Sequence, residues 1–324
     1  MADILVYALH YEGAFNRNSL GAVSEAARVA GLLGGQAHAV VVGDDATDAM
    51  CATLGRYGAA SVYRVPGPEG LAQPVVDAMA KLFGEHGFGY ALFGGGLLGF
   101  EIGAGLAARL GAGVAMEVTA VGVRDGRLVA ERPVLGDSAI SEISFRDVGI
   151  VIGRLNAFEA VESGSDVAVA EVAVEFSDFS TRARMVSRGE QRGEDVDIEG
   201  ADILVAGGRG LGRPEGFELC TELARALGPG SAVAATRAVV DAGWYPYAGQ
   251  IGQTGKTVSP KLYFAAGISG AIQHKVGMAG SENIVAINKD ANAPIFEFAD
   301  LGIVGDLNKI LPKLTAALQT RRDR

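Results

Sequence analysis

The stretch Leu262-Tyr-Phe-Ala-Ala-Gly-Ile-Ser-Gly-Ala-Ile-Gln-His274 decides the fold of the last third of this chain. Its first five residues, Leu262–Ala266, are apolar and predict a fully buried strand. The strand runs into Gly267, and we expect a helix to begin near Ser269. Because a helix start presents free N–H groups and the positive end of its dipole, this turn can receive an anion or an electron-rich oxygen.

Strands and helices alternate through the residues around this stretch. We expect strands at Ile203–Ala206, Ser231–Ala235, Leu262–Ala266, Ile284–Ile287 and Ile295–Phe298, and a helix at Glu215–Leu227. A last helix is predicted because one apolar face repeats at helical spacing, and Asp306 is placed to cap its start. That face consists of Leu307, Ile310, Leu311, Leu314, Ala317 and Leu318. The pattern indicates a doubly wound parallel sheet.

The first half of the chain shows the same alternation. Expected strands are Ile4–Ala8, Ala37–Val42, Ala60–Val65 and Tyr90–Phe93, and expected helices are Ser19–Leu33, Pro74–Phe83 and Phe100–Leu110. This order predicts a second doubly wound parallel sheet, so the fold class is α/β with two domains.

After about Ala115 the pattern changes to short β-branched segments. We expect strands at Val118–Val123, Arg127–Arg132 and Ala139–Phe145, with turns at Asp125-Gly126 and Gly136-Asp137, and a further strand at Val167–Phe176. An Asp-Gly pair is a good hairpin turn, so these segments predict β hairpins added to the first domain.

The polar, charged stretch Ser187–Gly200 is typical of a crossing between domains. We therefore divide the chain into an N-terminal domain, residues 1–196, and a C-terminal domain, residues 197–324.

Composition narrows the function classes. The chain has 324 residues, 49% hydrophobic and 20% charged, with a net charge of −10. An acidic chain lacks the basic face that nucleic-acid binding or docking on anionic lipid requires. The four histidines are scattered and form no metal-ligand cluster in the sequence. Cys51 and Cys220 lie outside any C-x-x-C pair, so we expect each to be a small buried hydrophobic residue. Such cysteines fit a protein of a reducing compartment.

The start of the chain and its apolar runs bear on location. Ile4–Ala8 already predicts a strand, so we expect no signal peptide, and no apolar run reaches the roughly 18–20 residues of a membrane span. We expect a cytoplasmic protein without direct membrane insertion; a processed mitochondrial matrix protein would look the same.

Two glycine motifs invite a different interpretation. Gly94–Gly99 fits G-x-G-x-x-G after a strand, and Glu117 falls near the distance of a ribose-binding acid. In a chain with 47 glycines such a match arises easily, so we favour a tight strand-to-helix turn over dinucleotide binding. Gly249–Thr257 resembles a phosphate loop but has five residues between its outer glycines, and Pro260 follows where a helix should begin.

Polar and glycine-rich loops follow the strands of the second domain. Gly207-Gly208-Arg209-Gly210 allows close approach of a ligand to the backbone beside a positive charge, although a plain turn with an exposed arginine is the alternative. Thr236-Arg237 and the 249–257 loop follow later strands. A lone His274 is often a structural histidine, but its place beside a glycine-rich pocket favours a ligand contact.

These loops lie within a run that resembles the electron transfer flavoprotein α subunits. GQTGKTVSPKLYFAAGISGAIQH and IVAINKDANAPIFEFADLGIVGDL match the family's C-terminal signature, and the similarity is nearly continuous from Leu204 to Leu318. Arg132-Pro133 and Arg154–Phe158 fit its first domain. The resemblance implies a nucleotide α-hydrolase-like first domain and a C-terminal domain that binds FAD. The segment Gly99–Gly105 departs from many relatives, which have an Asp and a Pro-Arg there.

The resemblance also implies the cofactor-binding residues. They are Arg209, Thr236, Arg237, Ile251, Gly252, Gln253, Thr254, Ser269, Gly270, Ala271, Ile272, Gln273, His274, Asn288, Asp306 and Leu307. Thr236 stands where the family usually has Ser. Among them we expect three to tune the reduction potential of the flavin. The charge of Arg237 would favour the anionic reduced forms, and Thr254 would form a hydrogen bond near N5. His274, with the helix start, would stabilise negative charge at N1 and the C2 carbonyl.

The family's partners complete the expectation. It pairs with a β subunit, accepts electrons from dehydrogenases such as the acyl-CoA dehydrogenases of fatty acid β-oxidation, and passes them singly to a quinone oxidoreductase or another acceptor. The chain is then an electron carrier more than a substrate-converting enzyme. An electron-bifurcating α subunit and a non-redox nucleotide-binding regulatory protein are the alternatives.

Overall fold

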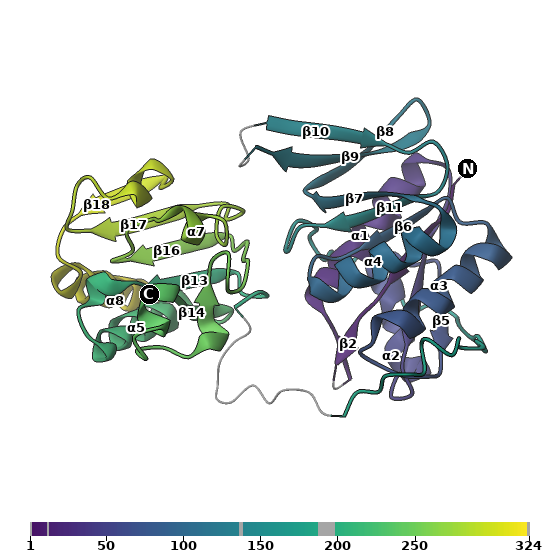
Figure 1. Ribbon diagram of the computed structural model, residues 1–324, viewed down its shortest axis with the longest axis horizontal. Helices are drawn as coiled ribbons and strands as arrows, with labels where there is room; N and C mark the ends of the chain where they lie inside the picture. Colours follow the sequence, from purple (N-terminus) through teal and green to yellow (C-terminus); the bar gives the residue numbers. More distant parts are fainter. Residues whose placement is uncertain (1, 12, 136–138, 187–197, 323–324) are drawn as a thin grey trace. The chain divides into compact units, whose positions relative to one another are not determined.

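The structure, a computed structural model, describes residues 2–11, 13–135, 139–186 and 198–322. The chain forms two compact units, residues 1–189 and 190–324 (Figure 1). Most of the predicted crossing Ser187–Gly200, and the predicted boundary at 196/197, fall on residues 187–197, outside the described part. The two domain limits therefore stay a prediction, and each unit is described by itself.

The described part of unit 1 contains a parallel sheet in the order β12-β5-β4-β1-β6-β11-β7. Its strands are β1 (Ile4–Tyr7), β4 (Ala37–Val42), β5 (Ser61–Val65), β6 (Tyr90–Phe93), β7 (Gly113–Val118), β11 (Gly149–Gly153) and β12 (Val169–Glu171). A small hairpin, β2 (His10–Tyr11) with β3 (Ala14–Phe15), follows β1. The helices are α1 (Arg17–Leu32), α2 (Asp48–Ala52), α3 (Ala72–His86) and α4 (Leu97–Leu110), with a 3-10 turn, η1 (Thr53–Tyr57).

Helices cover both faces of this sheet (Figure 1). Ile4 and Val6 point into a core shared with α1 and α2, whereas Leu5 and Tyr7 point into a core shared with α3 and α4. Because successive side chains of a strand alternate between faces, strands buried on both sides are apolar throughout. This confirms the predicted doubly wound arrangement.

The predicted β hairpins form an antiparallel sheet, β8 (Ala120–Arg124), β9 (Arg127–Val134) and β10 (Ala139–Ser144), in the order β10-β9-β8. Asp125 and Gly126 have φ values of +52° and +71°, as a two-residue hairpin turn with both central residues left-handed requires. The Asp-Gly prediction is confirmed. The second expected turn, at Gly136-Asp137, lies outside the described residues.

Several features of unit 1 differ from the sequence prediction. The expected strand Val118–Val123 is divided, because Val118 ends β7 and residues 120–123 belong to β8. The strand β11, which lies between β6 and the edge strand β7, was not predicted. Gly149 and Gly153 bound it because the rings of Phe145 and Phe158 occupy the space of their side chains. The strand expected at Val167–Phe176 is paired only over Val169–Glu171.

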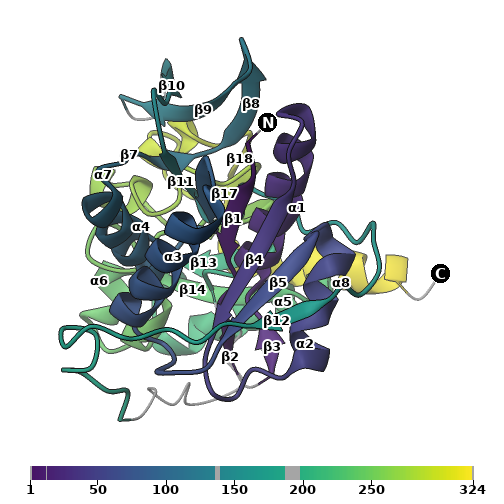
Figure 2. The same cartoon turned by 90° about the vertical axis from the view of Figure 1, so that its right-hand side faces the viewer.

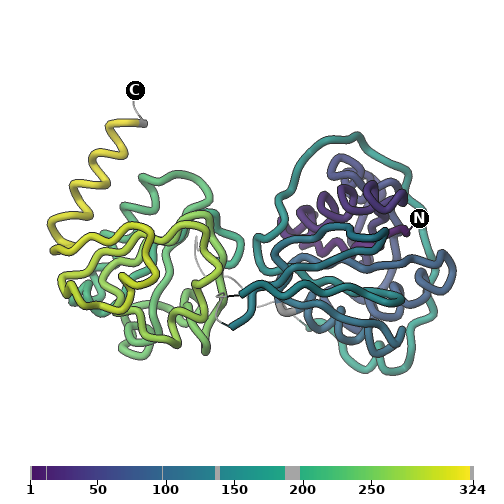
Figure 3. The backbone as a smooth tube through the Cα atoms, turned by 90° about the horizontal axis from the view of Figure 1, so that it is seen from above, coloured from purple at the N-terminus to yellow at the C-terminus, as the bar shows by residue number. Residues whose placement is uncertain are grey.

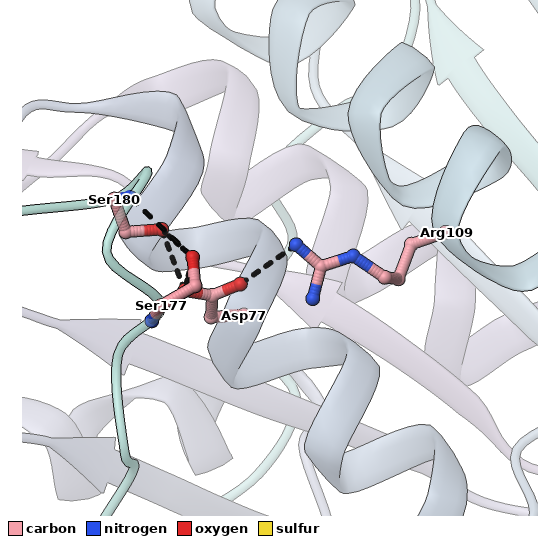
Figure 4. Close-up of polar contacts among 4 residues, drawn as sticks. All are labelled: Asp77, Arg109, Ser177 and Ser180. Atoms are coloured by element: carbon pink, nitrogen blue, oxygen red, sulfur yellow. Dashed lines mark hydrogen bonds and ion pairs between the residues drawn. The ribbon is translucent and has the colours of Figure 1, made fainter.

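After β12 the chain continues as an extended strap, residues 172–180, across the α3 and α4 side of the unit (Figure 2). The buried carboxylate of Asp77 on α3 fixes the strap. It accepts hydrogen bonds from the Ser177 nitrogen at 2.8 Å, the Ser177 hydroxyl at 2.9 Å and the Ser180 hydroxyl at 2.5 Å (Figure 4). Arg109 of α4 completes the cluster, 2.9 Å from the other carboxylate oxygen.

The departing segment Gly99–Gly105 lies inside α4. A Cβ on Gly103 would come within 2.5 Å of the Ile152 side chain, and one on Gly105 within 2.9 Å of Val76. The small residues therefore let α4 pack closely against β11 and α3.

Unit 2 contains a second parallel sheet, in the order β15-β14-β13-β16-β17-β18 over its described residues. Its strands are β13 (Ile203–Gly207), β14 (Ser231–Thr236), β15 (Gln250–Ile251), β16 (Leu262–Ala266), β17 (Ile284–Asn288) and β18 (Leu301–Val304). Its helices are α5 (Phe217–Leu227), α6 (Arg237–Val240), α7 (Ile272–Lys275) and α8 (Leu307–Arg322). The 3-10 turns are η2 (Arg209–Leu211), η3 (Pro214–Gly216), η4 (Tyr247–Gly249) and η5 (Pro294–Glu297).

One face of this sheet packs on α5 and α8, whereas loop residues such as Val258 and Met278 cover the other. The helix α8, yellow in Figure 3, buries Leu307 and Leu311, and Leu314 and Leu318 pack against the same core. Asp306 accepts a hydrogen bond from the Asn308 nitrogen at 3.0 Å, which confirms it as the cap. Ala317 is exposed, against prediction, and Thr315 is buried instead.

Two predicted elements of unit 2 are wrong. In place of the strand expected at Ile295–Phe298, the 3-10 turn η5 (Pro294–Glu297) forms, because Pro294 starts it and the Ile295 nitrogen bonds to the Ser269 carbonyl. The edge strand is β18, farther along the chain. The helix expected near Ser269 begins at Ile272 and has a single turn. Its dipole is correspondingly small, so the argument from a helix start loses its basis.

Within the described residues, no helix is both long and apolar enough to cross a membrane. Cys51 and Cys220 are fully buried, as predicted. Burial raises the pKa of Cys51 to about 11 and that of Cys220 to about 12, so both thiols are protonated at neutral pH.

Candidate functional site

A cavity of about 680 Å³ opens at the carboxyl ends of the strands of unit 2. The order of the sheet reverses between β13 and β16, because β14 lies on one side of β13 and β16 on the other. Ligands of doubly wound proteins bind at such a switch point. The cavity is lined by Gly208, Arg209, Gly210, Thr236, Arg237, Ala238, Asp241, Ile251, Gly252, Gln253, Thr254, Gly267, Ile268, Ser269, Ala271, Gln273, His274, Asn288, Lys289, Asp290, Ala293 and Pro294.

Three glycines form the floor at the switch point. The Gly208 nitrogen donates to the Ala266 carbonyl at 3.0 Å and the Gly210 nitrogen to the Gly267 carbonyl at 2.9 Å. A Cβ on Gly208 would lie 2.5 Å from the Gly267 oxygen, and one on Gly267 would lie 2.7 Å from the Gly210 Cα. Side chains are thus excluded here, and the loops after β13 and β16 meet backbone to backbone.

A second pair of segments forms the wall beside β15. The Gln253 nitrogen donates to the Gln273 carbonyl at 2.8 Å, and a Cβ on Gly252 would lie 2.9 Å from that same oxygen. The loop after Ile251 therefore packs directly on the turn of α7. Residues 258–261, directly after Thr257, form no helix, so the loop lacks the geometry of a phosphate loop, as the sequence indicated.

Thr254 presents its hydroxyl at this wall. The buried amide of Gln250 donates to the Thr254 Oγ1 at 3.2 Å, and the Tyr247 hydroxyl donates to its carbonyl at 2.8 Å. Since Oγ1 accepts from Gln250, its own hydrogen is directed elsewhere and can donate to a ligand.

The charges of the cavity favour an anion. Arg209, Arg237 and Lys289 are basic, whereas Asp241 and Asp290 are acidic. Arg237 is 3.2 Å from Asp241, and both side chains are exposed. On the opposite side of the mouth, Asn288 donates to the Ile268 carbonyl at 2.9 Å and accepts from the Asp290 nitrogen at 3.0 Å, which shapes the loop after β17.

His274 is buried beneath the wall. Its Nε2 lies 2.8 Å from the Tyr263 hydroxyl and its Nδ1 lies 3.3 Å from the Ile251 carbonyl. Burial lowers the pKa of His274 to about 4, against the opposing effect of the bond to Ile251. The imidazole is therefore neutral at physiological pH, and both of its nitrogens contact protein groups.

The structure brings most of the predicted site residues together. Twelve of the sixteen line the cavity: Arg209, Thr236, Arg237, Ile251, Gly252, Gln253, Thr254, Ser269, Ala271, Gln273, His274 and Asn288. The other four lie elsewhere. Gly270 packs on the Ile295 backbone, Ile272 is exposed, Leu307 is in the core, and Asp306 caps α8.

Sequence reasoning missed Lys289, Asp290 and Asp241 as lining residues. Lys289 and Asp290 directly follow β17, and Asp241 follows the short helix after β14. Their positions at the carboxyl ends of parallel strands were the signal that could have found them.

The glycine motif of unit 1 is a packing feature. A Cβ on Gly94 would lie 2.5 Å from the Asn18 oxygen, and one on Gly95 would lie 2.4 Å from the Leu155 nitrogen. At these two glycines the turn between β6 and α4 is filled by the chain's own backbone, whereas the Cβ position of Gly96 has nothing within 4 Å. The packing at Gly94 and Gly95 favours the tight-turn interpretation of the motif.

Comparisons with known proteins agree with this geometry. The family model described as "Electron transfer flavoprotein domain" matches residues 4–177, and the one described as "Electron transfer flavoprotein FAD-binding domain" matches residues 197–279. The electron transfer flavoprotein subunit alpha of Mycobacterium leprae (strain TN) is 42% identical over 330 residues, covering 99% of this chain and 100% of that protein.

Two further relatives are similar over nearly their full lengths. The electron transfer flavoprotein subunit alpha of Mycobacterium tuberculosis (strain ATCC 25618 / H37Rv) is 40% identical over 326 residues, covering 99% of this chain and 100% of that protein. Protein FixB of Clostridium saccharobutylicum is 38% identical over 322 residues, covering 97% of this chain and 95% of that protein.

Proposed function

Because this chain belongs to the electron transfer flavoprotein α subunits, we propose that it pairs with a β subunit and carries electrons singly between a dehydrogenase and an acceptor. Its second unit is the family's FAD-binding domain, and FAD is its cofactor. The observation that supports the carrier role is the cavity built from loops that follow five strands of unit 2.

The residues present fit FAD. Gly208, Gly210 and Gly267 let the loops after β13 and β16 meet backbone to backbone at the cavity, and the positive charge of Arg209 and Lys289 in the lining suits a diphosphate. We assign Arg209 and Ser269 to the diphosphate and Asn288 to the adenosine side. Asp306 and Leu307, which do not line the cavity, would act by placing the loop before α8.

FAD supplies the redox chemistry, and the protein binds it and sets its potential. We assign the potential to two side chains at the wall. Arg237 places a permanent cation at the mouth beside Thr236, and Thr254 has a hydroxyl hydrogen free of Gln250 with which to donate toward the flavin N5. Ile251, Gly252, Gln253, Ala271 and Gln273 contribute the wall itself. His274 acts from below it, as a neutral ring.

The partners follow from the family. We propose that electrons come from dehydrogenases such as those acting on acyl-CoA in fatty acid β-oxidation and pass to a quinone oxidoreductase. An electron-bifurcating α subunit, whose β subunit holds a second FAD, is the second candidate. A non-redox nucleotide-binding protein is a third, and it predicts a colourless preparation.

One preparation separates these candidates. The chain is purified with its β subunit, its absorption spectrum is recorded, and FAD is counted per heterodimer after release. One FAD per heterodimer, with two separate one-electron steps on reduction, supports the carrier. Two FAD per heterodimer support bifurcation, and the absence of flavin contradicts both.

A further inference from the structure

Tyr263, which lies outside the cavity lining, is fully buried on β16. Its hydroxyl is 2.8 Å from Nε2 of His274, on α7, and Nδ1 of His274 is 3.3 Å from the carbonyl of Ile251, on β15. The chain of hydrogen bonds thus joins three elements that are separate in sequence, and its last member lies at the wall of the cavity.

The direction of these hydrogen bonds follows from their ends. The Ile251 carbonyl can only accept, so Nδ1 must carry the proton that is donated to it. A neutral imidazole then has a lone pair on Nε2, so the Tyr263 hydroxyl must be the donor. Burial lowers the pKa of His274 to about 4 and raises that of Tyr263 well above its usual value, which agrees with two neutral groups.

We propose that Tyr263 is a positioning residue of the FAD site: by donating to Nε2 it holds the His274 imidazole as the Nδ1–H tautomer, bonded to the Ile251 carbonyl. The proposal rests on the FAD site described above. It assigns to His274 a role through the position of the wall, because its Nδ1 bonds to the Ile251 carbonyl there.

The wall depends on this position because its segments pack backbone to backbone. The Gln253 nitrogen bonds to the Gln273 carbonyl, and a Cβ on Gly277 would lie 2.4 Å from the Gly252 nitrogen. His274 lies between these contacts in sequence. A shift of its ring would therefore move Gly252 and Gln253, and with them the hydroxyl of Thr254.

The charged groups on the surrounding elements have other partners. The ammonium of Lys275, on α7, lies 3.9 Å from the centre of the Phe298 ring. That of Lys256, on the loop after β15, is 3.7 Å from Glu199, and that of Lys261, just before β16, is 3.9 Å from Asp202. Tyr263 is thus the titratable group that contacts the His274 ring in the described structure.

The test reads the tautomer directly. The full chain is labelled with ¹⁵N-histidine, and ring nitrogen shifts are followed by NMR from pH 5 to 9 with and without FAD. The chain has four histidines, so the His274 signals are identified by their loss in His274→Gln. We expect a protonated Nδ1, an unprotonated Nε2 and no titration in this range. An Nε2–H tautomer, or a titration near pH 6.5, would overturn the proposal.

Tyr263→Phe removes only the donor. We expect the ring to lose its single tautomer, its pKa to rise, and FAD to bind about three- to tenfold more weakly. Tyr245→Phe is the matched control, because its hydroxyl bonds to the Val233 carbonyl away from the cavity, and it should change neither reading. An unchanged tautomer in Tyr263→Phe overturns the proposal. The tautomer of the FAD-free chain is independent of cofactor binding, so failure of the FAD site would show separately, as failure to bind FAD.

Discussion

Arg237 and Asp241 face each other at the mouth of the FAD cavity, with Nε of the arginine 3.2 Å from Oδ2 of the aspartate. The two side chains are 64% and 62% exposed, so their ion pair adds little to stability. Its importance is electrostatic, because Asp241 offsets the one permanent cation that we assign to the flavin end of the site.

Removing the charge of Arg237 and removing the charge of Asp241 should shift the flavin potential in opposite directions. Arg237→Ala should lower the potential of the first electron and Asp241→Asn should raise it, each by tens of millivolts. Two unit charges about 4 Å apart interact by about 1 kcal/mol in water, and about 59 mV corresponds to a tenfold change for one electron. Spectroelectrochemical titration of the heterodimer measures both.

The control is Glu222→Gln, on the exposed side of α5 and away from the cavity. It should leave the potential unchanged, and high salt should reduce the shifts of the two cavity variants. Equal potentials in Arg237→Ala and the parent protein would remove Arg237 from the flavin end.

The strap of unit 1 should open in acid. Burial alone would raise the pKa of Asp77, but hydrogen bonds from Ser180, Ser177 and Arg109 outweigh it and hold the pKa below its usual value. A lowered pKa contributes stability that is present above about pH 4, the value in an unfolded chain, and is lost as the pH falls through the folded value. Hydrogen exchange of residues 172–180, measured against pH, should show protection lost only below about pH 4.

The same contacts predict the effect of substitution at neutral pH. Asp77→Asn should lose about 1.5–3 kcal/mol, the usual value of hydrogen bonds to a charged group, and exchange in the strap should accelerate at least tenfold. Asp178→Asn, an exposed carboxylate in the same strap, is the control. Similar exchange in the two variants would mean that Asp77 does not fix the strap.

The glycine turn of unit 1 should respond as packing and not as a ligand site. Gly95→Ala places a Cβ 2.4 Å from the Leu155 nitrogen and should destabilise unit 1 by about 1–3 kcal/mol, with FAD affinity unchanged. Gly122→Ala meets nothing within 4 Å and should be tolerated. Urea unfolding measures the stability of both variants, and FAD titration measures their affinity. Weaker FAD binding in Gly95→Ala would contradict the packing role and favour a nucleotide site at Gly94–Gly99.

Local sequence was enough for elements that are apolar and bounded by polar residues or glycine. Ala37–Val42, Tyr90–Phe93 and Leu262–Ala266 begin and end as predicted. Local sequence was not enough where tertiary contacts determine the secondary structure of a segment. Ile295 lies in a 3-10 turn because its nitrogen bonds to Ser269, and Gly149–Gly153 becomes a strand beside β6 and β7, whose distance in sequence hides the pairing.

The site shows the same division. The loops that form the cavity could be predicted because parallel strands bring their carboxyl ends to one edge, and twelve predicted residues lie there. The state of His274 could not be predicted. Its two partners, Tyr263 and Ile251, are known only once α7 is packed on β15 and β16, and its burial there keeps the ring neutral.

The central claim is that the cavity of unit 2 holds FAD, and two arginines four residues apart test it most directly. Arg209 lines the cavity, whereas Arg213 does not and pairs with Glu215 at 3.8 Å. FAD is titrated into the FAD-depleted heterodimer carrying Arg209→Ala or Arg213→Ala. We predict affinity about ten- to a hundredfold lower for Arg209→Ala, the value of a hydrogen bond to a charged group, and parent affinity for Arg213→Ala. Equal FAD affinity in the two variants, or no FAD binding by the parent heterodimer, would contradict the account.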